Sequence, residues 1–374
     1  MSTLVPIVDP DGLLEYSVVF NDRSLNHMSG AFQKVMLDIS KGLRDVYGAE
    51  AVVLVPGGGT FGMEAVARQF ASGRRCLVIR NGWFSYRWTQ ILEMGRIPSE
   101  EIVLKARPVH DGHQAAYAPA PLETVVETIR RERPEVVFAP HVETSAGIIL
   151  PDDYIKAVAE AVHDVGGIMV LDCVASGAIW VDMRTCGVDV LISAPQKGWS
   201  ASPCSALVML SAEGERVMSE RPSSSYACDL LKWRQIMQAY EAGGHAYHGT
   251  LPTDSLAQFR DAMHETRDRG FGKVKEQQQE LGRRVRTLLK DFGYPSVAAT
   301  GFEAPGVVVS YTEDDLIKNG SKFAAVGLQT AAGVPLMCDE PPEFKTFRIG
   351  LFGLDKLGHI DRTVDKLEEA LRSL

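Results

Sequence analysis

Three short segments of the sequence carry residues that could do chemistry together. Gly57-Gly58-Gly59-Thr60 follows one apolar run, Asp172 ends a second, and Lys197 follows a third. Glycines ahead of a helix let backbone N–H groups approach an anion closely, and the helix N-terminus adds a favourable dipole. A desolvated lysine has a depressed pKa and becomes a good amine nucleophile toward carbonyl groups. The segments suggest a phosphate cradle, a strand-end carboxylate and an activated amine.

Each segment taken alone also fits a plain structural role. The glycines could form only a tight strand-to-helix turn, since neither a Walker A loop nor the usual dinucleotide fingerprint is present. Asp172 could simply cap the next helix, and Lys197 could lie at the surface. Neither residue identifies a site without the other.

The combination is more specific than its members, because it fits pyridoxal phosphate. Lys197 would hold the aldehyde as a Schiff base, and Asp172 would pair with the protonated ring nitrogen. Gly58, Gly59 and Thr60 would hold the phosphate. The aromatic turn Asn81-Gly82-Trp83-Phe84-Ser85-Tyr86-Arg87-Trp88 would supply a face against the ring, although aromatic residues more often pack in a core.

The elements that must position these residues alternate along the chain. Six short runs are apolar on both faces, which is typical of strands buried on both sides of a mainly parallel sheet. They are Ala51–Pro56, Arg75–Arg80, Glu135–Pro140, Gly167–Asp172, Val188–Ala194 and Ser205–Leu210. Helices are expected between them, at Thr60–Ser72, Pro121–Arg133 and Asp152–Val165. The pattern predicts an α/β fold with helices sandwiching the sheet and ligands at the carboxyl ends of the strands.

The pattern changes after about residue 261. Asp268–Gly293 predicts one long helix, Gly306–Tyr311 a short strand and His359–Leu374 a final helix, as in a smaller α+β domain. We therefore expect three parts: an N-terminal segment packing near the small domain (1–20), a large cofactor-binding domain (21–260) and a small C-terminal domain (261–374).

Seven motifs, from about His27 to the C-terminus, resemble the class V (fold-type I) pyridoxal-phosphate aminotransferases, nearest to the alanine–glyoxylate and serine–pyruvate branch. They are PGGGTFGMEA, NGWFSYR, HVETSAG, LDCVAS, SAPQKGW, YHGTLP and FRIGLFG. The resemblance implies Lys197 as the Schiff-base lysine and Asp172 as the partner of the pyridine nitrogen. It further implies Phe84 stacked on the ring, Thr144 near the ring oxygen or phosphate, and Gln196 on the phosphate side.

The same resemblance implies a homodimer with shared active sites. Tyr247 and Thr250 of YHGTLP would reach the phosphate of the neighbouring subunit. Arg348 of FRIG would grip the substrate carboxylate, a task that suits a bidentate guanidinium. The implied activity moves an amino group from a small, alanine-like or serine-like amino acid to a 2-oxo acid such as pyruvate or glyoxylate. Lys197, once free, would move the proton from the substrate Cα.

Two segments depart from the family pattern. Residues 18–23 lead almost directly into Asn26-His27-Met28-Ser29, where relatives usually carry a Pro-Gly-Pro loop and a helix beside the substrate pocket. Met337–Pro342 replaces a Gly-rich stretch ahead of Arg348. We expect the acids of that segment, Asp339 and Glu340, to face solvent.

Several alternatives stay open. A 2-aminoethylphosphonate–pyruvate aminotransferase or a lyase would need only a different pocket. A cysteine desulfurase could use Cys338, but those enzymes have His before the lysine and over the ring, where this chain has Gln196 and Phe84. A non-catalytic protein could keep the fold for binding, which the intact Lys197 and Asp172 disfavour.

Composition sets the class of protein. The 374 residues are 45% hydrophobic and 23% charged, as in a globular chain, and 39 basic against 48 acidic residues give a net charge of -9. That charge disfavours a nucleic-acid partner. No zinc-like spacing, signal peptide or membrane-length apolar run is present, and six scattered cysteines are typical of reduced thiols. We expect a cytoplasmic protein without a metal.

Overall fold

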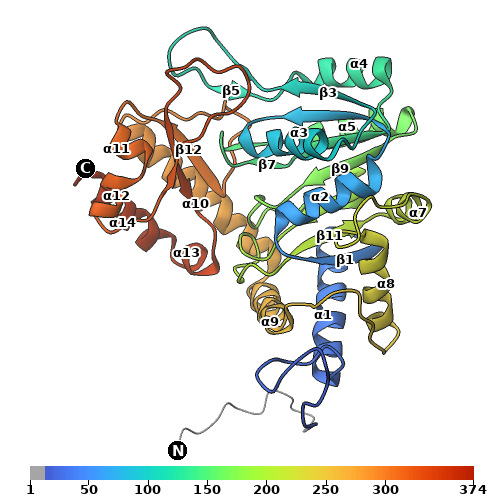
Figure 1. The fold of residues 1–374 in the computed structure, drawn as a ribbon. Helices are drawn as coiled ribbons and strands as arrows, with labels where there is room; N and C mark the ends of the chain where they lie inside the picture. The colour runs from blue at the N-terminus through green and yellow to red at the C-terminus, as the bar shows by residue number, and fades with distance from the viewer. Residues whose placement is uncertain (1–12) are drawn as a thin grey trace, which may run out of the picture.

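A seven-stranded sheet organises the larger part of the chain (Figure 1). The computed structural model describes residues 13–374. The strand order is β1-β11-β10-β9-β6-β2-β3. Parallel pairing joins β10, β9, β6, β2 and β3, whereas β11 runs antiparallel to both of its neighbours. The strands are β1 (Ala51–Pro56), β2 (Arg75–Arg80), β3 (Glu100–Lys105), β6 (Val136–Pro140), β9 (Ile168–Asp172), β10 (Val190–Ser193) and β11 (Ser205–Leu210). The expected mainly parallel sheet is confirmed.

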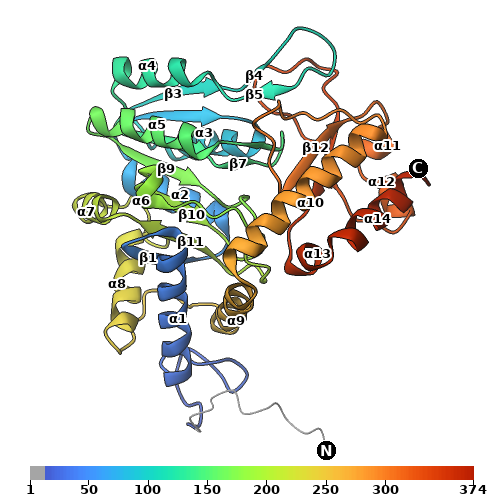
Figure 2. The ribbon, with the colours of Figure 1, turned by 180° about the vertical axis from the view of Figure 1, so that it is seen from behind.

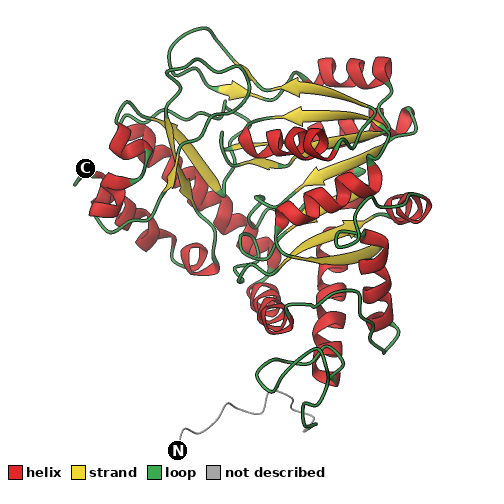
Figure 3. Cartoon of the chain, in the orientation of Figure 1, coloured by secondary structure: helices red, strands yellow, loops and turns green. Residues whose placement is uncertain are grey.

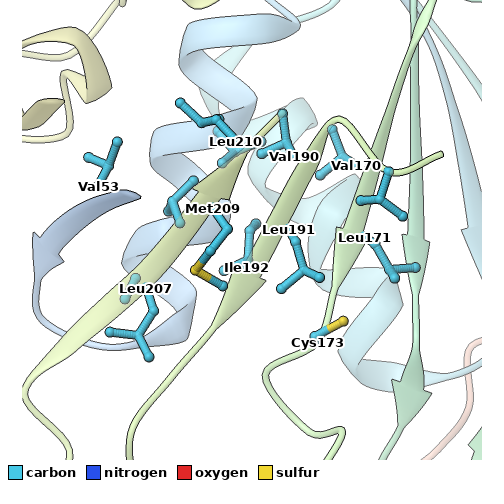
Figure 4. Close-up of a cluster of buried hydrophobic side chains, with 14 of the residues drawn as sticks. Val53, Val170, Leu171, Cys173, Val190, Leu191, Ile192, Leu207, Met209 and Leu210 are labelled. Atoms are coloured by element: carbon cyan, nitrogen blue, oxygen red, sulfur yellow. The ribbon is translucent and has the colours of Figure 1, made fainter. Parts of the chain in front are cut away.

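The central strands form the core because both of their faces are apolar. Every residue of β6, β9, β10 and β11 is buried. Side chains of β9, β10 and β11 lie side by side in the centre of the sheet, as Figure 4 shows for Leu171, Leu191 and Met209, which pair in register. Asp172 pairs in register with Ile192 of β10, so this carboxylate lies at the edge where the parallel strands end. The register of the sheet thereby determines the position of Asp172.

Helices cover both faces of the sheet (Figures 2 and 3). In Figure 1, α2 and α3 lie on the face toward the viewer, and α5 lies on the opposite one (Figure 2). The expected helices are confirmed to within about two residues, as α2, α4 and α5. The helices of this part are α1 (Gly30–Tyr47), α2 (Gly59–Phe70), α3 (Trp83–Gly95), α4 (Leu122–Glu132), α5 (Asp152–Asp164), α6 (Met183–Cys186), α7 (Ala212–Glu220), α8 (Leu230–Glu241) and α9 (Thr253–Arg269).

Two short hairpins extend the ends of the sheet strands. One pairs β4 (Arg107–Pro108) with β5 (Tyr117–Ala118), and the other pairs β7 (Val142–Glu143) with β8 (Ile148–Ile149). The second hairpin follows β6 directly. It therefore lies at the same edge of the sheet as Asp172.

The C-terminal part packs helices against a small antiparallel sheet with the order β12-β14-β13. Its core includes Leu281, Val308 and Phe347. The elements are α10 (Phe271–Asp291), β12 (Val307–Tyr311), α11 (Asp315–Lys318), α12 (Ser321–Ala325), β13 (Ala331–Ala332), β14 (Thr346–Gly350), α13 (Leu354–Gly358) and α14 (Ile360–Leu371). The expected strand and final helix are present.

One expected helix is wrong at its start. The chain does not form a single helix from residue 268, because Gly270 adopts a φ of 90° and separates α9 from α10. That conformation favours glycine. The helix α9 crosses the expected boundary at residue 261 and places Phe259 and Met263 in the core of the large part.

The described part of the N-terminal segment packs against the start of α1. The Asn26 side chain donates a hydrogen bond to Glu15 Oε2 at 2.6 Å, and the rings of Phe20 and His27 lie 5.4 Å apart. Figures 1 and 2 show this segment at the far end of α1 from the small domain, so for residues 13–20 the expected packing near that domain is wrong. Residues 1–12 lie outside the described residues. Among residues 13–374, no helix is long and apolar enough to cross a membrane.

Candidate active site

A pocket of about 130 Å³ lies where β9 and β10 end. The residues that the sequence singled out supply most of its lining: Gly59, Thr60, Phe84, Thr144, Asp172, Gln196 and Lys197. They come from separate turns that follow β1, β2, β6, β9 and β10. Because those strands run in the same direction, their carboxyl ends bring the turns to one edge of the sheet.

Asp172 and Lys197 are the two ionisable groups deepest in this pocket. Asp172 is 8% exposed, and its Oδ1 accepts a hydrogen bond from the Val174 backbone N–H at 2.9 Å. Burial raises the pKa of Asp172 to about 6, although the Val174 N–H and the Lys197 ammonium act to lower it. Burial also lowers the pKa of Lys197, against the raising effect of Asp172. The pocket therefore holds a carboxylate and an amine that are both poorly hydrated.

The glycine-rich turn forms the start of α2 against the wall of the pocket. Gly58 is the N-cap residue and Gly59 the first residue of the helix. A Cβ on Gly59 would lie 2.6 Å from a methyl carbon of Val174, so only glycine fits beside that side chain. Thr60 Oγ1 accepts a hydrogen bond from Arg87 Nη1 at 2.9 Å. The helix N-terminus and the guanidinium together make this end of the pocket suited to an anion.

Phe84 forms an aromatic wall between two arginines. The guanidinium carbon of Arg87 lies 5.1 Å from the ring centroid, and that of Arg348 lies 5.5 Å from it. Arg348 is half-buried, and its Nε donates to the Ala332 carbonyl at 2.8 Å. Burial lowers the pKa of Arg348, against the raising effect of Glu143. Arg348 thus adjoins the pocket through Phe84 without lining it.

Two buried polar atoms of the pocket have no partner in the described part of the chain. They are the Thr144 hydroxyl oxygen and the Gln196 side-chain oxygen. Buried polar atoms are almost always hydrogen-bonded, so two orphans in one pocket indicate a polar ligand. A phosphate cradle, an amine, a carboxylate and a flat aromatic wall complete a donor and acceptor set that fits pyridoxal phosphate.

Some expected site residues lie outside this pocket. Gly58 belongs to the glycine-rich turn but does not line the pocket. A Cβ at this position would meet nothing within 4 Å. Tyr247 and Thr250 lie between α8 and α9, where the Tyr247 hydroxyl and Thr250 Oγ1 are 3.0 Å apart. Both side chains are exposed. Within one chain, the fold does not bring them to Lys197.

Three further residues belong to the site although the sequence did not single them out. Arg87 lines the pocket, the Phe352 ring lies 5.7 Å from Lys197 Nζ, and Glu143 hydrogen-bonds to the turn that carries Phe84. All three stand inside motifs that already pointed to the site. By contrast Trp88, which also belongs to α3, is a core residue whose ring centroid lies 4.4 Å from that of Phe138.

The segment ahead of Arg348 turns its acids away from the pocket. Asp339 pairs with Lys105 Nζ at 2.6 Å, and Glu340 accepts hydrogen bonds from the backbone of Leu336, Met337 and Cys338. Asp339 is exposed, as expected, whereas Glu340 serves as a local cap. Burial raises the pKa of the Cys338 thiol to about 12, so this cysteine is protonated at neutral pH. An unexposed, protonated thiol does not suit desulfuration.

The sheet, the small domain and a lysine–aspartate pocket at the strand ends define a fold-type I pyridoxal-phosphate enzyme. The family profile described as aminotransferase class-V matches residues 13–308. The chain therefore belongs to the class-V aminotransferase family, and it is a transaminase.

Named relatives come from several organisms. The chain is 29% identical to a 2-aminoethylphosphonate–pyruvate transaminase of Paraburkholderia xenovorans, over 83% of this chain and 80% of that one. It is 24% identical to rat alanine–glyoxylate aminotransferase, over 94% of this chain and 83% of the relative. It is also 26% identical to a Synechococcus protein named as the small subunit of a soluble hydrogenase, over 76% and 71% of the two chains.

Solved structures confirm the fold. An alanine–glyoxylate aminotransferase from Nostoc superimposes with a TM-score of 0.77 at 22% identity, over 93% of this chain and 88% of that one. The ureidoglycine–glyoxylate aminotransferase of Bacillus subtilis gives 0.78 at 21% identity, over 96% and 87%.

Proposed function

We propose that this pocket binds pyridoxal phosphate, and that the enzyme moves an amino group from a small amino acid to a 2-oxo acid such as pyruvate or glyoxylate. The observation that carries the proposal is the presence of a poorly hydrated amine and a buried carboxylate in one pocket, beside a helix N-terminus that suits an anion. The names of the relatives support small amino donors and 2-oxo acceptors.

The candidate site residues would contact different parts of the cofactor. Lys197 would hold the aldehyde carbon, Asp172 the ring nitrogen and Phe84 the ring face. Gly58, Gly59, Thr60 and Gln196 would hold the phosphate, and Thr144 would donate to the ring oxygen or phosphate. When bound, pyridoxal phosphate supplies a carbonyl for the amino group and a ring that withdraws electrons from the substrate Cα.

The chain's own groups then perform the binding and the proton transfer. Arg348, next to Phe84, would bind the substrate carboxylate through its guanidinium. Lys197 must be neutral to accept a proton from the substrate Cα, and burial favours that state by lowering its pKa. Asp172 must be ionised to pair with a protonated nitrogen, and a cation beside it lowers its raised pKa. Both groups must therefore be deprotonated, a state that burial favours for Lys197 and that a neighbouring cation favours for Asp172.

The active site is proposed to be shared between two subunits. Tyr247 and Thr250 would reach the phosphate of the neighbouring subunit, a role supported by their exposure and by their absence from the lining of the pocket that contains Lys197. The free state of all six cysteines supports a cytoplasmic location.

An absorption spectrum of the purified protein tests cofactor binding. We expect a visible band that borohydride removes and that Lys197→Ala lacks. A protein that takes up pyridoxal phosphate without any visible band, or a Lys197→Ala variant that keeps it, would contradict the proposal.

A half-reaction screen tests the substrate. The loaded enzyme would be mixed with alanine, serine, aspartate, cysteine or 2-aminoethylphosphonate, and the loss of the visible band would be followed. We expect alanine or serine to act fastest. Faster reaction with 2-aminoethylphosphonate would favour the activity named for the Paraburkholderia relative, for which Arg87 offers a second cation in the pocket. Release of sulfide from cysteine would contradict aminotransfer.

A further inference from the structure

The side chain of Glu143 is fully buried and accepts hydrogen bonds from two separate segments. Its Oε1 accepts from the Phe84 backbone N–H at 3.2 Å and from the Ser145 N–H and hydroxyl at 3.0 and 2.7 Å. Its Oε2 accepts from the Ser85 N–H and hydroxyl at 2.8 and 2.7 Å. Glu143 is 0% exposed, so no water competes for these oxygens.

The two segments carry two different walls of the pocket. Phe84 lies in the first turn of α3 and supplies the aromatic wall, whereas Thr144, between Glu143 and Ser145, supplies the unpartnered hydroxyl. One carboxylate therefore joins the two walls. A shift of its position would move the ring and the hydroxyl relative to each other.

The junction has no spare room. A Cβ on Gly82 would lie 2.0 Å from Ser145 Oγ and 2.7 Å from Glu143 Cγ. The Trp83 N–H also donates to Ser145 Oγ, at 2.9 Å. The backbone ahead of α3 is thus in close contact with the side chains of Glu143 and Ser145.

The junction suits a side chain that only accepts hydrogen bonds. Every group that faces the two oxygens is a donor, and an ionised carboxylate is a side chain that only accepts. An amide of the same shape would turn its own N–H groups toward N–H donors and leave them unsatisfied. Glutamine is therefore a sharp probe, because it changes hydrogen bonding and charge without changing volume.

We propose that Glu143 is a positioning residue that sets the spacing between the Phe84 ring and the Thr144 hydroxyl, and thereby the geometry in which the pocket holds its cofactor. The inference rests on the proposed binding of pyridoxal phosphate. It adds a residue that reaches the pocket walls through hydrogen bonds to Phe84, Ser85 and Ser145. Its charge also acts to raise the pKa values of Asp172, Lys197 and Arg348.

The test compares Glu143→Gln with a buried carboxylate just ahead of β10, Asp189. Asp189 is 4% exposed and accepts from the Met169 N–H at 2.8 Å and from the Ser211 hydroxyl at 3.1 Å, but it does not line the pocket. Unlike Glu143 it also lies 2.8 Å from a histidine ring nitrogen, His163 Nε2. Three quantities are measured for Glu143→Gln and Asp189→Asn: the melting temperature of cofactor-free protein, the dissociation constant of pyridoxal phosphate, and the visible circular dichroism of the bound cofactor.

We expect both variants to melt earlier, but only Glu143→Gln to change the site. Loss of charge-assisted hydrogen bonds to the pocket walls should weaken cofactor binding about tenfold or more. The visible circular dichroism should also change in sign or intensity at full occupancy. If Glu143→Gln lowers the melting temperature but binds pyridoxal phosphate with the wild-type affinity and circular dichroism, Glu143 has only a structural role. That result would overturn the proposal.

A milder variant serves if Glu143→Gln does not fold. Ser145→Ala removes one donor and keeps the carboxylate, so we expect a smaller loss of cofactor affinity with an altered visible spectrum. An unchanged affinity and spectrum in Ser145→Ala would then overturn the inference. Failure of the proposed function is distinguishable, because in that case the wild-type protein itself would lack the visible band.

Discussion

Replacing Asp172 by asparagine should stabilise the cofactor-free protein while disabling the enzyme. Burial raises the pKa of Asp172 from its ordinary 3.8 to about 6. Because 1 pKa unit corresponds to about 1.4 kcal/mol, keeping this carboxylate ionised in the folded chain costs about 3 kcal/mol above pH 6. Asparagine has the shape of the protonated acid and can still accept from the Val174 N–H, so it removes that cost.

The sign of the pH dependence follows from the direction of the shift. A carboxyl whose folded pKa is raised stabilises the fold in its protonated state, and this contribution is lost as the pH rises from about 3.8 through about 6. The advantage of Asp172→Asn should therefore be near zero at pH 4 and approach about 3 kcal/mol at neutral pH.

Urea unfolding of the cofactor-free protein across this pH range measures the difference. Asp164→Asn is the control, since Asp164 is exposed and its one ion pair within residues 13–374 is a 3.8 Å contact with Arg130. The same Asp172→Asn variant, loaded with cofactor, should turn over amino donors far more slowly. A variant that is no more stable than wild type at neutral pH would refute the burial argument.

Three further predictions concern the pocket and the dimer. Gly59→Ala should cost about 1–3 kcal/mol in thermal unfolding, because its Cβ would lie 2.6 Å from a Val174 methyl, and it should weaken cofactor binding in a titration. Cys338 should react slowly with a thiol reagent at pH 8, since its pKa is raised to about 12, and Cys338→Ala should keep aminotransfer; rapid labelling would contradict its burial. Tyr247→Phe and Lys197→Ala chains should each be weakly active alone but regain activity in mixed dimers, whereas no gain on mixing would argue against shared sites.

The fold could be predicted from sequence because its signals are local. Strands such as β9 and β10 are apolar on both faces, which is enough to indicate a buried parallel sheet. The break between α9 and α10 was missed because helical spacing continues on both sides of Gly270, and only its backbone conformation shows that the helix stops. The packing of residues 13–20 against the start of α1 was missed because nothing in that segment identifies its partner.

The candidate site could be predicted in part for the same reason. Lys197, Asp172 and the glycine turn each follow a recognisable strand, so their meeting at one edge follows from topology. Glu143 had no such signal. Its role comes from a hairpin folding back onto a turn about sixty residues away along the chain, with a separation of 59 positions to Phe84. Arg87 likewise had no sequence signal, because it stands among aromatic residues and its role depends on the hydrogen bond to Thr60.

The class of chemistry follows from residue types, their order and the strands that precede them, all of which are local properties of the chain. The protonation state and accessibility of those groups follow from the folded structure. Burial and neighbours distant in sequence raise the pKa of Asp172 to about 6 and that of Cys338 to about 12. They also decide which groups Tyr247 contacts. Desolvation and hydrogen bonding act through space, so only the folded chain sets them.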